Sequence, residues 1–271
     1  MSILTPGNIA VVTGGSSGIG QAVAAALTDL ELRVVIASDR VTDLERAAGE
    51  LSAQGRLVDR ILCDVQSREA VERMAVELIS RYGRVDLLIN NAGYAVYRSF
   101  EESSLDEIES LLDVNLAGAM RCTKAFLPSM ISRRAGRIVN IASLAGGVII
   151  TPNAVYCAAK HGMVAWTRTL RYELDRFGLS ANVVCPGLTK TRFHDHPTFQ
   201  RRQNHRRDGR SWMMPEQVAA QVIRAIRRDR AVTYVPGWQG LVAWALAAAP
   251  FAVEPLWGRV MRKRISALYE D

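Results

Sequence analysis

Short apolar runs alternate with longer amphipathic stretches along most of this chain. The runs are four or five residues long and are rich in Val, Ile, Leu and Ala, and the stretches after them repeat apolar residues at helical spacing. Strands covered on both faces are nearly continuously apolar, so the runs indicate a buried parallel sheet. The predicted strands are Ile9–Thr13, Val34–Ala37, Val58–Leu62, Val85–Ile89, Arg137–Ile141, Ala181–Val184 and Ala231–Val235.

The stretches between the runs predict helices that connect one strand to the next. They are Gln21–Asp29, Leu44–Ala53, Glu69–Arg81, Leu105–Ser132, Val155–Phe177 and a helix that opens at Pro215. This alternation, with right-handed crossovers, predicts an α/β fold: a Rossmann-type doubly wound parallel sheet of about seven strands with helices on both faces. We expect one domain over residues 1–237, with a lid at about 190–215, and an extension over residues 238–271.

The net charge of +7 on 271 residues is concentrated in one region. From Arg192 to Arg230 there are ten arginines and four acidic residues, while the rest of the chain is nearly neutral. That distribution argues against a general nucleic-acid-binding surface. The sequence shows no secretory signal, no apolar run of the roughly 18 residues that a membrane span needs, and four scattered cysteines, so we expect a cytoplasmic protein with reduced thiols.

A glycine-rich segment follows the first predicted strand and opens the first helix. Its spacing is G-x-x-x-G-x-G, which differs from the commoner G-x-G-x-x-G fingerprint. A plain tight turn could use the same glycines, but the position between a strand and a helix favours a phosphate site at the helix N-terminus. The residues expected to contact a dinucleotide here are Thr13, Gly14, Ser16, Ser17, Gly18, Ile19 and Gly20.

With this loop and the motifs after the later strands, the chain resembles the short-chain dehydrogenase/reductase family over about residues 8–236. Asn90-Asn91-Ala92-Gly93 follows the fourth strand, Asp64 follows the third, and Pro186-Gly187 with Thr189 and Thr191 follows the sixth. The resemblance implies a nicotinamide dinucleotide, NAD or NADP, as cofactor. Beyond the glycine loop, it assigns cofactor contacts to Ser38, Asp39, Arg40, Asp64, Val65, Asn91, Ala92, Gly93, Tyr156, Lys160, Pro186, Gly187, Thr189 and Thr191.

The choice between NAD and NADP depends on the end of the second strand. In the family, an acid there holds the ribose hydroxyl of NAD, and a nearby base holds the phosphate of NADP. This chain has serine at the usual acidic position, followed by an acid and a base, in Ser38-Asp39-Arg40. Ser17 stands where many NADP enzymes have a basic residue. The sequence leans to NAD, and the alternative is that Asp39 and Arg40 belong to a solvated turn.

A tyrosine and a lysine lie four residues apart in Tyr156-Cys-Ala-Ala-Lys160, on one face of a predicted helix. Together with Ser143 and Asn115 they match the catalytic tetrad of the family in order and local motif. Hydride transfer to or from nicotinamide needs a proton donor or acceptor at the substrate oxygen. A neighbouring cation such as Lys160 can lower the pKa of a phenol from its usual value of about 10. The resemblance further implies that Ser143 orients the carbonyl and that Asn115 supports a water relay.

The predicted lid departs most from familiar patterns. It contains His194 and His196 without a third ligand at metal spacing, so no metal site is expected. Five arginines lie between residues 201 and 210 and form either a solvated lid or an attraction for an anionic thioester substrate or membrane. The apolar lid residues, which would suit a lipophilic substrate, are Phe193, Phe199, Trp212, Met213 and Met214.

The extension begins with an apolar stretch, Leu241–Val253, which is interrupted by Pro250 and followed by a basic segment, Arg259–Arg264. It is too short to span a bilayer but could form an interfacial helix. We favour packing against the chain's own sheet, the substrate cleft or a partner subunit over peripheral membrane contact.

These features predict an NAD(P)-dependent oxidoreductase that interconverts a secondary alcohol and a ketone on a lipophilic small-molecule substrate. The alternative is a dinucleotide-binding sensor or scaffold that keeps the fold without catalysis. The family resemblance implies a homodimer or homotetramer formed through Leu105–Ser132 and Val155–Phe177.

Overall fold

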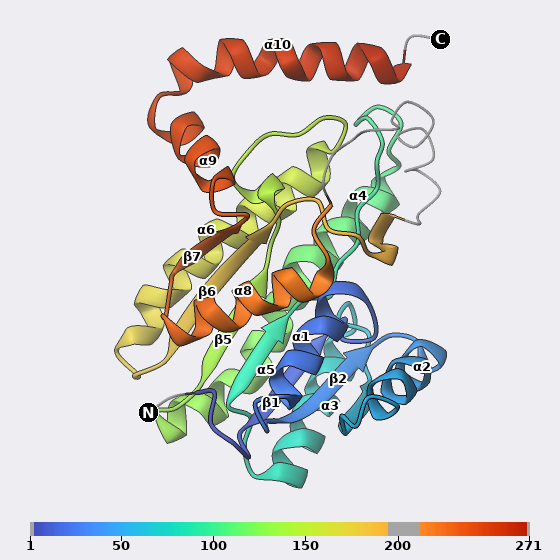
Figure 1. Cartoon of the computed structure of the whole chain (residues 1–271), viewed down its shortest axis with the longest axis vertical. Coiled ribbons are helices and arrows are strands. Elements are labelled where there is room, and N and C mark those ends of the chain that lie inside the picture. The colour runs from blue at the N-terminus through green and yellow to red at the C-terminus, as the bar shows by residue number, and fades with distance from the viewer. Residues whose placement is uncertain (1–2, 195–211, 270–271) are drawn as a thin grey trace.

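In this computed structural model, which describes residues 3–194 and 212–269, seven parallel strands form one sheet (Figure 1). The strand order β3-β2-β1-β4-β5-β6-β7 reverses direction between β1 and β4, which is the topological switch point of a doubly wound sheet. The predicted Rossmann-type α/β fold is therefore confirmed. The strands are β1 (Ile9–Thr13), β2 (Arg33–Ser38), β3 (Val58–Leu62), β4 (Leu87–Asn90), β5 (Arg137–Ile141), β6 (Ser180–Pro186) and β7 (Val232–Val235).

Helices cover both faces of the sheet. They are α1 (Gly18–Thr28), α2 (Val41–Ser52), α3 (Arg68–Tyr82), α4 (Leu105–Leu112), α5 (Gly118–Arg133), α6 (Ala154–Asp175), α8 (Pro215–Arg227), α9 (Gln239–Ala248) and α10 (Pro250–Tyr269). Short turns lie at η1 (Asp113–Ala117), η2 (Leu144–Gly146) and η3 (Arg192–His194). Residues of α1, α2 and α8 pack on one face, and those of α3, α5 and α6 pack on the other.

The alternation along each strand divides the core into these two layers. In β1, Ala10 and Val12 join the α1–α8 layer, whereas Ile9 and Val11 join the layer of α3, α5 and α6. Because successive strand side chains point to opposite faces, a run that is apolar throughout fills both layers. The continuous apolar runs of the sequence therefore have a direct structural cause.

The limits of β1, β3 and β5 agree with the predictions, whereas most other elements differ from them by one to three residues at one or both ends. β4 begins at Leu87, because the Asp86 carboxylate rather than a strand carbonyl accepts the Ile9 amide at 2.9 Å. α1 begins at Gly18, inside the glycine loop, so that its first N–H groups face the end of β1. The single helix predicted over residues 105–132 contains a π-helical turn, η1, between α4 and α5.

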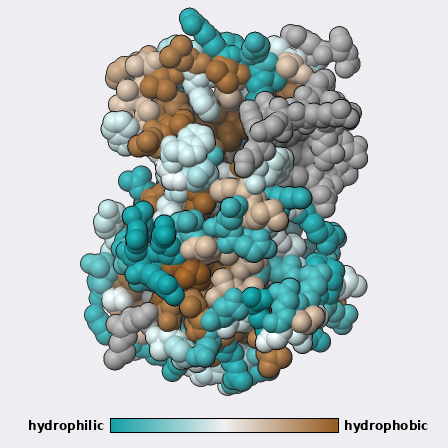
Figure 2. All heavy atoms as spheres, viewed as in Figure 1, coloured by the Kyte–Doolittle hydropathy of each residue, from teal (hydrophilic) through white to brown (hydrophobic). Residues whose placement is uncertain are grey.

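The extension folds into α9 and α10 and lies over the carboxyl end of the sheet (Figure 1). α9 packs against β7, and α10 contacts two loops near that edge. Trp257 donates its indole N–H to Ile149 O at 2.8 Å, and Arg264 bonds the Tyr97 hydroxyl at 3.1 Å. On the side in view in Figure 2, hydrophobic side chains gather over α9 and the start of α10. Within the described residues, no helix is long and apolar enough to cross a membrane.

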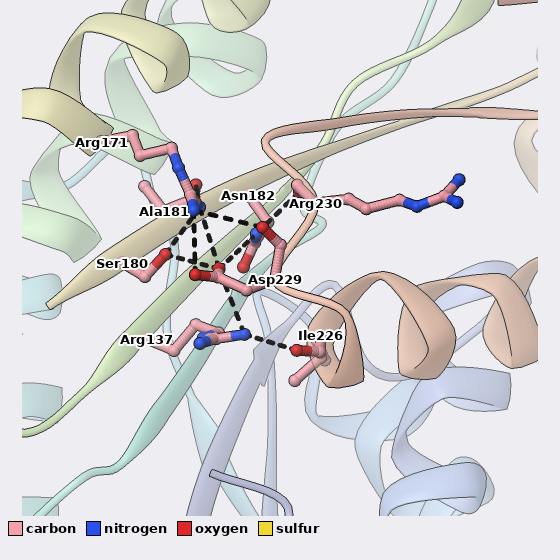
Figure 3. Close-up of polar contacts among 8 residues, drawn as sticks. All are labelled: Arg137, Arg171, Ser180, Ala181, Asn182, Ile226, Asp229 and Arg230. Carbon is pink, nitrogen blue, oxygen red and sulfur yellow. Dashed lines mark hydrogen bonds and ion pairs between the residues drawn. The ribbon is translucent and has the colours of Figure 1, made fainter. Parts of the chain in front are cut away.

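At the opposite end of the strands, the Asp229 carboxylate connects the turn before β7 to α6, β6 and β5 (Figure 3). Asp229 accepts two hydrogen bonds of 2.9 Å from Arg171 on α6, and others from Ser180 and Asn182 on β6 at 2.7 and 3.1 Å. Arg137 at the start of β5 lies 3.4 Å away. Burial raises the pKa of the Asp229 carboxyl, but these hydrogen bonds outweigh it and hold the pKa well below its ordinary value.

We expect Asp229→Asn to lower the free energy of unfolding at neutral pH by about 1–2 kcal/mol, a figure reduced for partial exposure. Asparagine tolerates the positive φ of 47° at this position, so the change isolates the charge. The contribution is complete above about pH 4, the pKa of an unfolded aspartate, and is lost as pH falls through the lower folded pKa. Urea denaturation at about pH 7 and about pH 3 should therefore show a smaller difference at the lower pH.

Glu77→Gln is the matched control, since it removes one negative charge from an exposed position on α3. If both variants unfold at the same urea concentration as the parent protein, the Asp229 cluster does not stabilise the fold.

Candidate active site

The glycine loop places the N-terminus of α1 at the carboxyl end of β1. Gly14 and Gly18 have φ values of +61° and +53°, which side chains rarely adopt. A Cβ atom at Gly20 would lie 2.2 Å from Gly14 O, so the backbone turns back on itself here. Ser17 is the extended residue before the helix, and the first turn of α1 contains no acidic residue. The loop thus presents backbone N–H groups and the positive end of the helix dipole.

The loops after β1 and β4 are tied together by Thr13 and Asn91. The Thr13 hydroxyl accepts hydrogen bonds from the backbone N–H groups of Asn91 and Ala92, at 3.1 and 3.2 Å. The Asn91 side-chain amide donates in return to Thr13 O and Gly14 O, at 3.1 and 3.0 Å. These hydrogen bonds hold the two loops that flank the switch point together as one unit, here called the ledge, which consists of Thr13, Gly14, Asn91 and Ala92.

Residues after the other strands meet at the same edge. Thr191, which follows β6, lies against the glycine loop, with its Cγ2 3.0 Å from the position of a Cβ on Gly18. Thr189 is buried and donates to Gly187 O at 3.1 Å. After β3, Asp64 is exposed and accepts the Gln66 N–H at 2.9 Å. The remaining predicted contacts lie beside these residues, at Ser16, Ile19, Val65 and Pro186.

The end of β2 carries a chain of hydrogen bonds that leads to a carboxylate. The Ser16 hydroxyl donates to Ser38 at 3.1 Å, and the Ser38 hydroxyl donates to Asp39 at 3.3 Å. Ser38 is buried, whereas Asp39 and Arg40 are exposed. The Arg46 guanidinium reaches the glycine loop, where it donates a hydrogen bond to Ser16 O at 2.8 Å. It also forms an ion pair with Glu50 at 2.9 Å.

This edge fits a dinucleotide. The glycine turn leaves no room for Cβ atoms on its inner side, and the α1 N-terminus offers N–H groups without a competing carboxylate. A pyrophosphate would be held at the glycine loop, a ribose near Asp39, and a nicotinamide near Pro186, Gly187 and Thr189.

Tyr156, Ser143 and Lys160 converge next to the ledge. Tyr156 and Lys160 lie one turn apart on α6, and the Lys160 ammonium is 5.6 Å from the Tyr156 ring centroid. Lys160 is 3% exposed and donates to Ile141 O at 3.3 Å, at the end of β5. Ser143 follows that strand and is close enough to Tyr156 to affect its pKa. The ring of Phe193 packs against that of Tyr156, with 5.9 Å between centroids.

Asn115 completes this group from the π-helical turn η1. Its amide donates to Tyr94 O at 2.8 Å and to Leu111 O at 3.0 Å, which fixes the side chain. Its Oδ1 atom is buried and has no hydrogen-bond partner among the described residues. A Cβ on Gly93 would lie 2.6 Å from that Oδ1 and 3.5 Å from the Lys160 ammonium. A glycine at 93 therefore lets both groups approach the ledge, and π turns of this kind are frequent at functional sites.

Burial governs the protonation of this group. It raises the pKa of the Tyr156 phenol well above its ordinary value, and the Ser143 hydroxyl offsets only part of that rise. Burial also lowers the pKa of Lys160 to about 8. The sequence predicts that Lys160 lowers the pKa of the phenol, but in this structure desolvation is the larger effect because both side chains are almost completely enclosed.

A pocket opens beside Tyr156 and contains residues that the sequence did not single out. Its lining is Val96, Arg98, Phe100, Ser103, Glu107, Ile108, Leu111, Asn153, Ala154, Val155 and Tyr156. Arg98 and Glu107 form an ion pair of 2.9 Å in this wall. Gln239 of α9 was also missed, and its amide abuts Gly187. No local motif marks these positions, because they reach the site only through the path of distant segments.

Part of the predicted lid lies outside the described residues, including His196, Phe199 and the arginines between residues 201 and 210. Within residues 3–194 and 212–269, no group of three or more His, Cys, Asp or Glu residues could hold a metal ion. Met213 forms an isolated bridge with Thr189, so the end of the lid returns to the edge of the sheet.

A doubly wound sheet with a glycine turn at its switch point defines a dinucleotide-binding α/β protein. Comparison with known proteins narrows this class. The family model described as short chain dehydrogenase matches residues 8–201. The chain belongs to the short-chain dehydrogenase/reductase family, a family of NAD(P)-binding oxidoreductases.

Relatives and solved structures agree with that membership. The chain is 39% identical over 187 residues to the ketoacyl reductase HetN of Nostoc sp., a match that covers 69% of this chain and just under two thirds, 65%, of HetN. It superimposes with a TM-score of 0.77 and 34% identity on an actinorhodin polyketide ketoreductase with NADPH, covering 86% of this chain and 97% of that one. A Burkholderia phymatum short-chain dehydrogenase in complex with NAD gives a TM-score of 0.78 at 28% identity, with 84% and 89% covered. Members of this fold family therefore bind either NAD or NADP.

We expect Lys160→Met to raise the free energy of unfolding of the cofactor-free protein at neutral pH by on the order of 2 kcal/mol. The fold must bury an ammonium whose pKa is lowered to about 8 from 10.5, and methionine removes that cost. Between those two pH values the unfolded chain holds a proton that the folded chain has lost, so the stability of the parent protein rises with pH. The difference in the free energy of unfolding between Lys160→Met and the parent protein should therefore become smaller as the pH rises from about 8 to about 10.5.

Urea denaturation at about pH 7 and about pH 10 measures both effects. Lys124→Met removes an exposed ammonium from α5 and serves as the control. A Lys160→Met protein less stable than its parent at both pH values would contradict the assignment of a buried, destabilising charge.

Proposed function

We propose that this protein is an NAD(P)-dependent oxidoreductase that interconverts a ketone and a secondary alcohol on a lipophilic, acyl-type substrate. The observation that supports this most is the convergence of Tyr156, Ser143, Lys160 and Asn115 beside the ledge between β1 and β4. A phenol, a hydroxyl and an ammonium at one end of a dinucleotide site are the groups that carbonyl reduction requires.

Each side chain has a distinct task in this proposal. The bound dinucleotide supplies the hydride for reduction or accepts it in oxidation. The Ser143 hydroxyl holds and orients the substrate carbonyl, and the Tyr156 phenol gives its proton to the oxygen. Lys160 holds the ribose hydroxyls and can return a proton to Tyr156. The unpaired Oδ1 of Asn115 can accept a hydrogen bond from a water molecule that links Lys160 to solvent.

Burial affects the protonation of both Tyr156 and Lys160 in the cofactor-free protein. Because burial raises the pKa of Tyr156, the phenol keeps its proton at neutral pH and is suited to act as an acid. Lys160, with a pKa of about 8, is close to neutrality and can release or regain a proton readily.

Apolar side chains form part of the wall beside Tyr156. Val96, Ile108 and Val155 contribute apolar walls, while the charges of Arg98 and Glu107 neutralise each other. Ketoacyl and polyketide reductases are among the proteins most similar to this chain. An acyl chain that carries a ketone is the substrate class that these observations favour together.

The end of β2 favours NAD as the cofactor. Asp39 stands directly after the strand and accepts a hydrogen bond from Ser38, which links it to the glycine loop. Asp39 stands one residue beyond the usual acidic position, and its carboxylate would bind ribose hydroxyls and repel a phosphate there. Arg46, whose charge is paired with Glu50 and Asp43, is poorly placed to hold a phosphate in its stead.

We expect Asp39→Ser to raise KM for NADH by about 10-fold or more, since a hydrogen bond to a charged group is lost, while KM for NADPH stays equal or falls. Steady-state kinetics with each cofactor measures the ratio. Glu45→Gln removes an exposed carboxylate from α2 and should leave the ratio within about twofold of the parent value. A parent protein that prefers NADPH would contradict this assignment while leaving the proposed reaction intact.

We expect Tyr156→Phe to reduce kcat by about 1,000-fold and to change the dinucleotide Kd by less than about twofold, because it removes only the proton donor. Fluorescence titration with NADH measures the Kd, and loss of NADH absorbance with a 3-ketoacyl thioester measures turnover. Tyr82→Phe is the control, since its hydroxyl bonds Asp59 far from the site. Substantial turnover by Tyr156→Phe would refute the mechanism, and absence of turnover in the parent with intact dinucleotide binding would favour a sensor or scaffold.

The proposed assembly is a homodimer or homotetramer formed through α4–α5 and α6. Tyr172 on α6 is 80% exposed, as an aromatic residue in a subunit contact would be in an isolated chain.

A further inference from the structure

The extension exposes an unusual number of large apolar side chains, here called the tail surface. Its members are Trp238, Leu241, Trp244, Phe251, Leu256 and Val260. Their exposed fractions run from 56% for Val260 to 84% for Phe251. Figure 2 shows the hydrophobic side chains gathered over α9 and the start of α10. Scattered apolar residues are normal on a surface, but a gathered set marks an interaction site.

The inner side of α9 is lined by small residues, so the large ones are directed outward. A Cβ on Gly240 would lie 3.0 Å from the Tyr234 ring, and Ala243, which is 5% exposed, packs near Gly147. Leu241 and Trp244 are three residues apart and are 70% and 69% exposed. The helix thus packs on the protein through Gly and Ala and presents Trp and Leu to the outside, which is the reverse of an ordinary surface helix.

The described part of the extension is mainly basic, with Arg259, Arg262, Lys263 and Arg264 against Glu254, and Glu270 and Asp271 follow at the end of the chain. No charged residue occurs from Ala231 to Val253, and Glu254 is the one acidic residue between positions 238 and 269. Arg259, Arg262 and Lys263 are exposed on α10. In the part of the chain that the structure describes, none of these three forms an ion pair. Large apolar side chains and cations without an ion pair among the described residues are therefore both exposed on the extension.

We propose that the tail surface docks the protein on the surface of an anionic lipid bilayer. Tryptophan prefers the interface between headgroups and acyl chains, and basic residues beside it are attracted to anionic headgroups. A second copy of the chain is a poorer occupant, because a symmetric contact through this surface would bring two like-charged clusters together. The surface is also carried on protruding helices, which suits insertion into a bilayer.

Docking would set the orientation of the active site. The inner side of α10 bonds the loops that border the pocket, through Arg264 to Tyr97 and through Tyr269 to Ser99 at 3.0 Å. The pocket beside Tyr156 would therefore lie close to the lipid headgroups. Lipid binding itself does not depend on the proposed reaction, so the two can be tested separately.

Co-sedimentation of the full chain with sucrose-loaded vesicles tests the proposal. One set of vesicles is phosphatidylcholine alone, and the other contains phosphatidylglycerol as well. We expect the parent protein to sediment with the anionic vesicles, with its tryptophan emission shifted to shorter wavelength. Leu241→Ser combined with Trp244→Ser should reduce the bound fraction by about tenfold or more, since two interfacial anchors are lost.

Two further variants separate the contributions. Replacement of Arg259, Arg262 and Lys263 by Gln should reduce binding to the anionic vesicles by about tenfold or more, so that the preference over phosphatidylcholine vesicles is lost. Leu57→Ser removes a leucine that is 84% exposed elsewhere on the molecule and should bind like the parent. NADH titration and circular dichroism of every variant report whether the fold is intact.

The proposal is overturned if the parent protein ignores anionic vesicles at low ionic strength. It is also overturned if Leu57→Ser and the double variant bind equally well, because the tail surface is then not the contact. A smaller oligomer for the double variant in gel filtration, without vesicle binding by the parent, would assign the surface to a second copy instead.

Discussion

The contact between the loops after β1 and β4 is the constraint on which the rest of the site depends. Asn91 donates to two carbonyl oxygens of the glycine loop, and Thr13 accepts two backbone N–H groups in return. Next to this tie, Gly93 leaves room for Asn115 and Lys160. The cofactor loop and the proton-handling residues therefore share one support. Displacement of either loop would alter both binding and proton transfer.

Burial of the active-site side chains lowers the stability of the empty protein and at the same time favours its chemistry. A buried ammonium and a buried phenol are each pushed toward their neutral forms, which destabilises the empty protein. The same desolvation strengthens electrostatic interactions with a substrate or cofactor. The carboxylate of Asp229 shows the opposite solution at the other edge of the sheet, where several donors keep it charged and stabilise the turn. Stability and reactivity are thus concentrated at opposite ends of the strands.

Much of the fold follows from local pattern. β1, β3 and β5 have the predicted limits. The apolar residues of β1 and β5 fill two core layers, whereas β3 is only partly buried and places Val58 against one layer and Ile61 against the other. The glycine loop and the Tyr156–Lys160 pair are local motifs, so their positions could be predicted as well. The π turn around Asn115 could not, since its extra residue is accommodated by bonds to Tyr94 and Leu111 rather than by composition. The contact of Gln239 with Gly187 depends on chain folding across more than one element.

In the extension, the two sides of one helix, α10, face two different environments. The sequence of α10 alternates apolar and basic residues without a clean period, so the pattern alone does not decide between packing and an interface. In the structure, Trp257 and Arg264 turn inward to the loops beside the pocket, whereas Phe251 and Leu256 turn outward. A helix held on its inner side by specific hydrogen bonds does not need its outer apolar residues for folding. Those residues are then free to serve a contact outside the protein, and the hydrogen bonds connect that contact to the pocket.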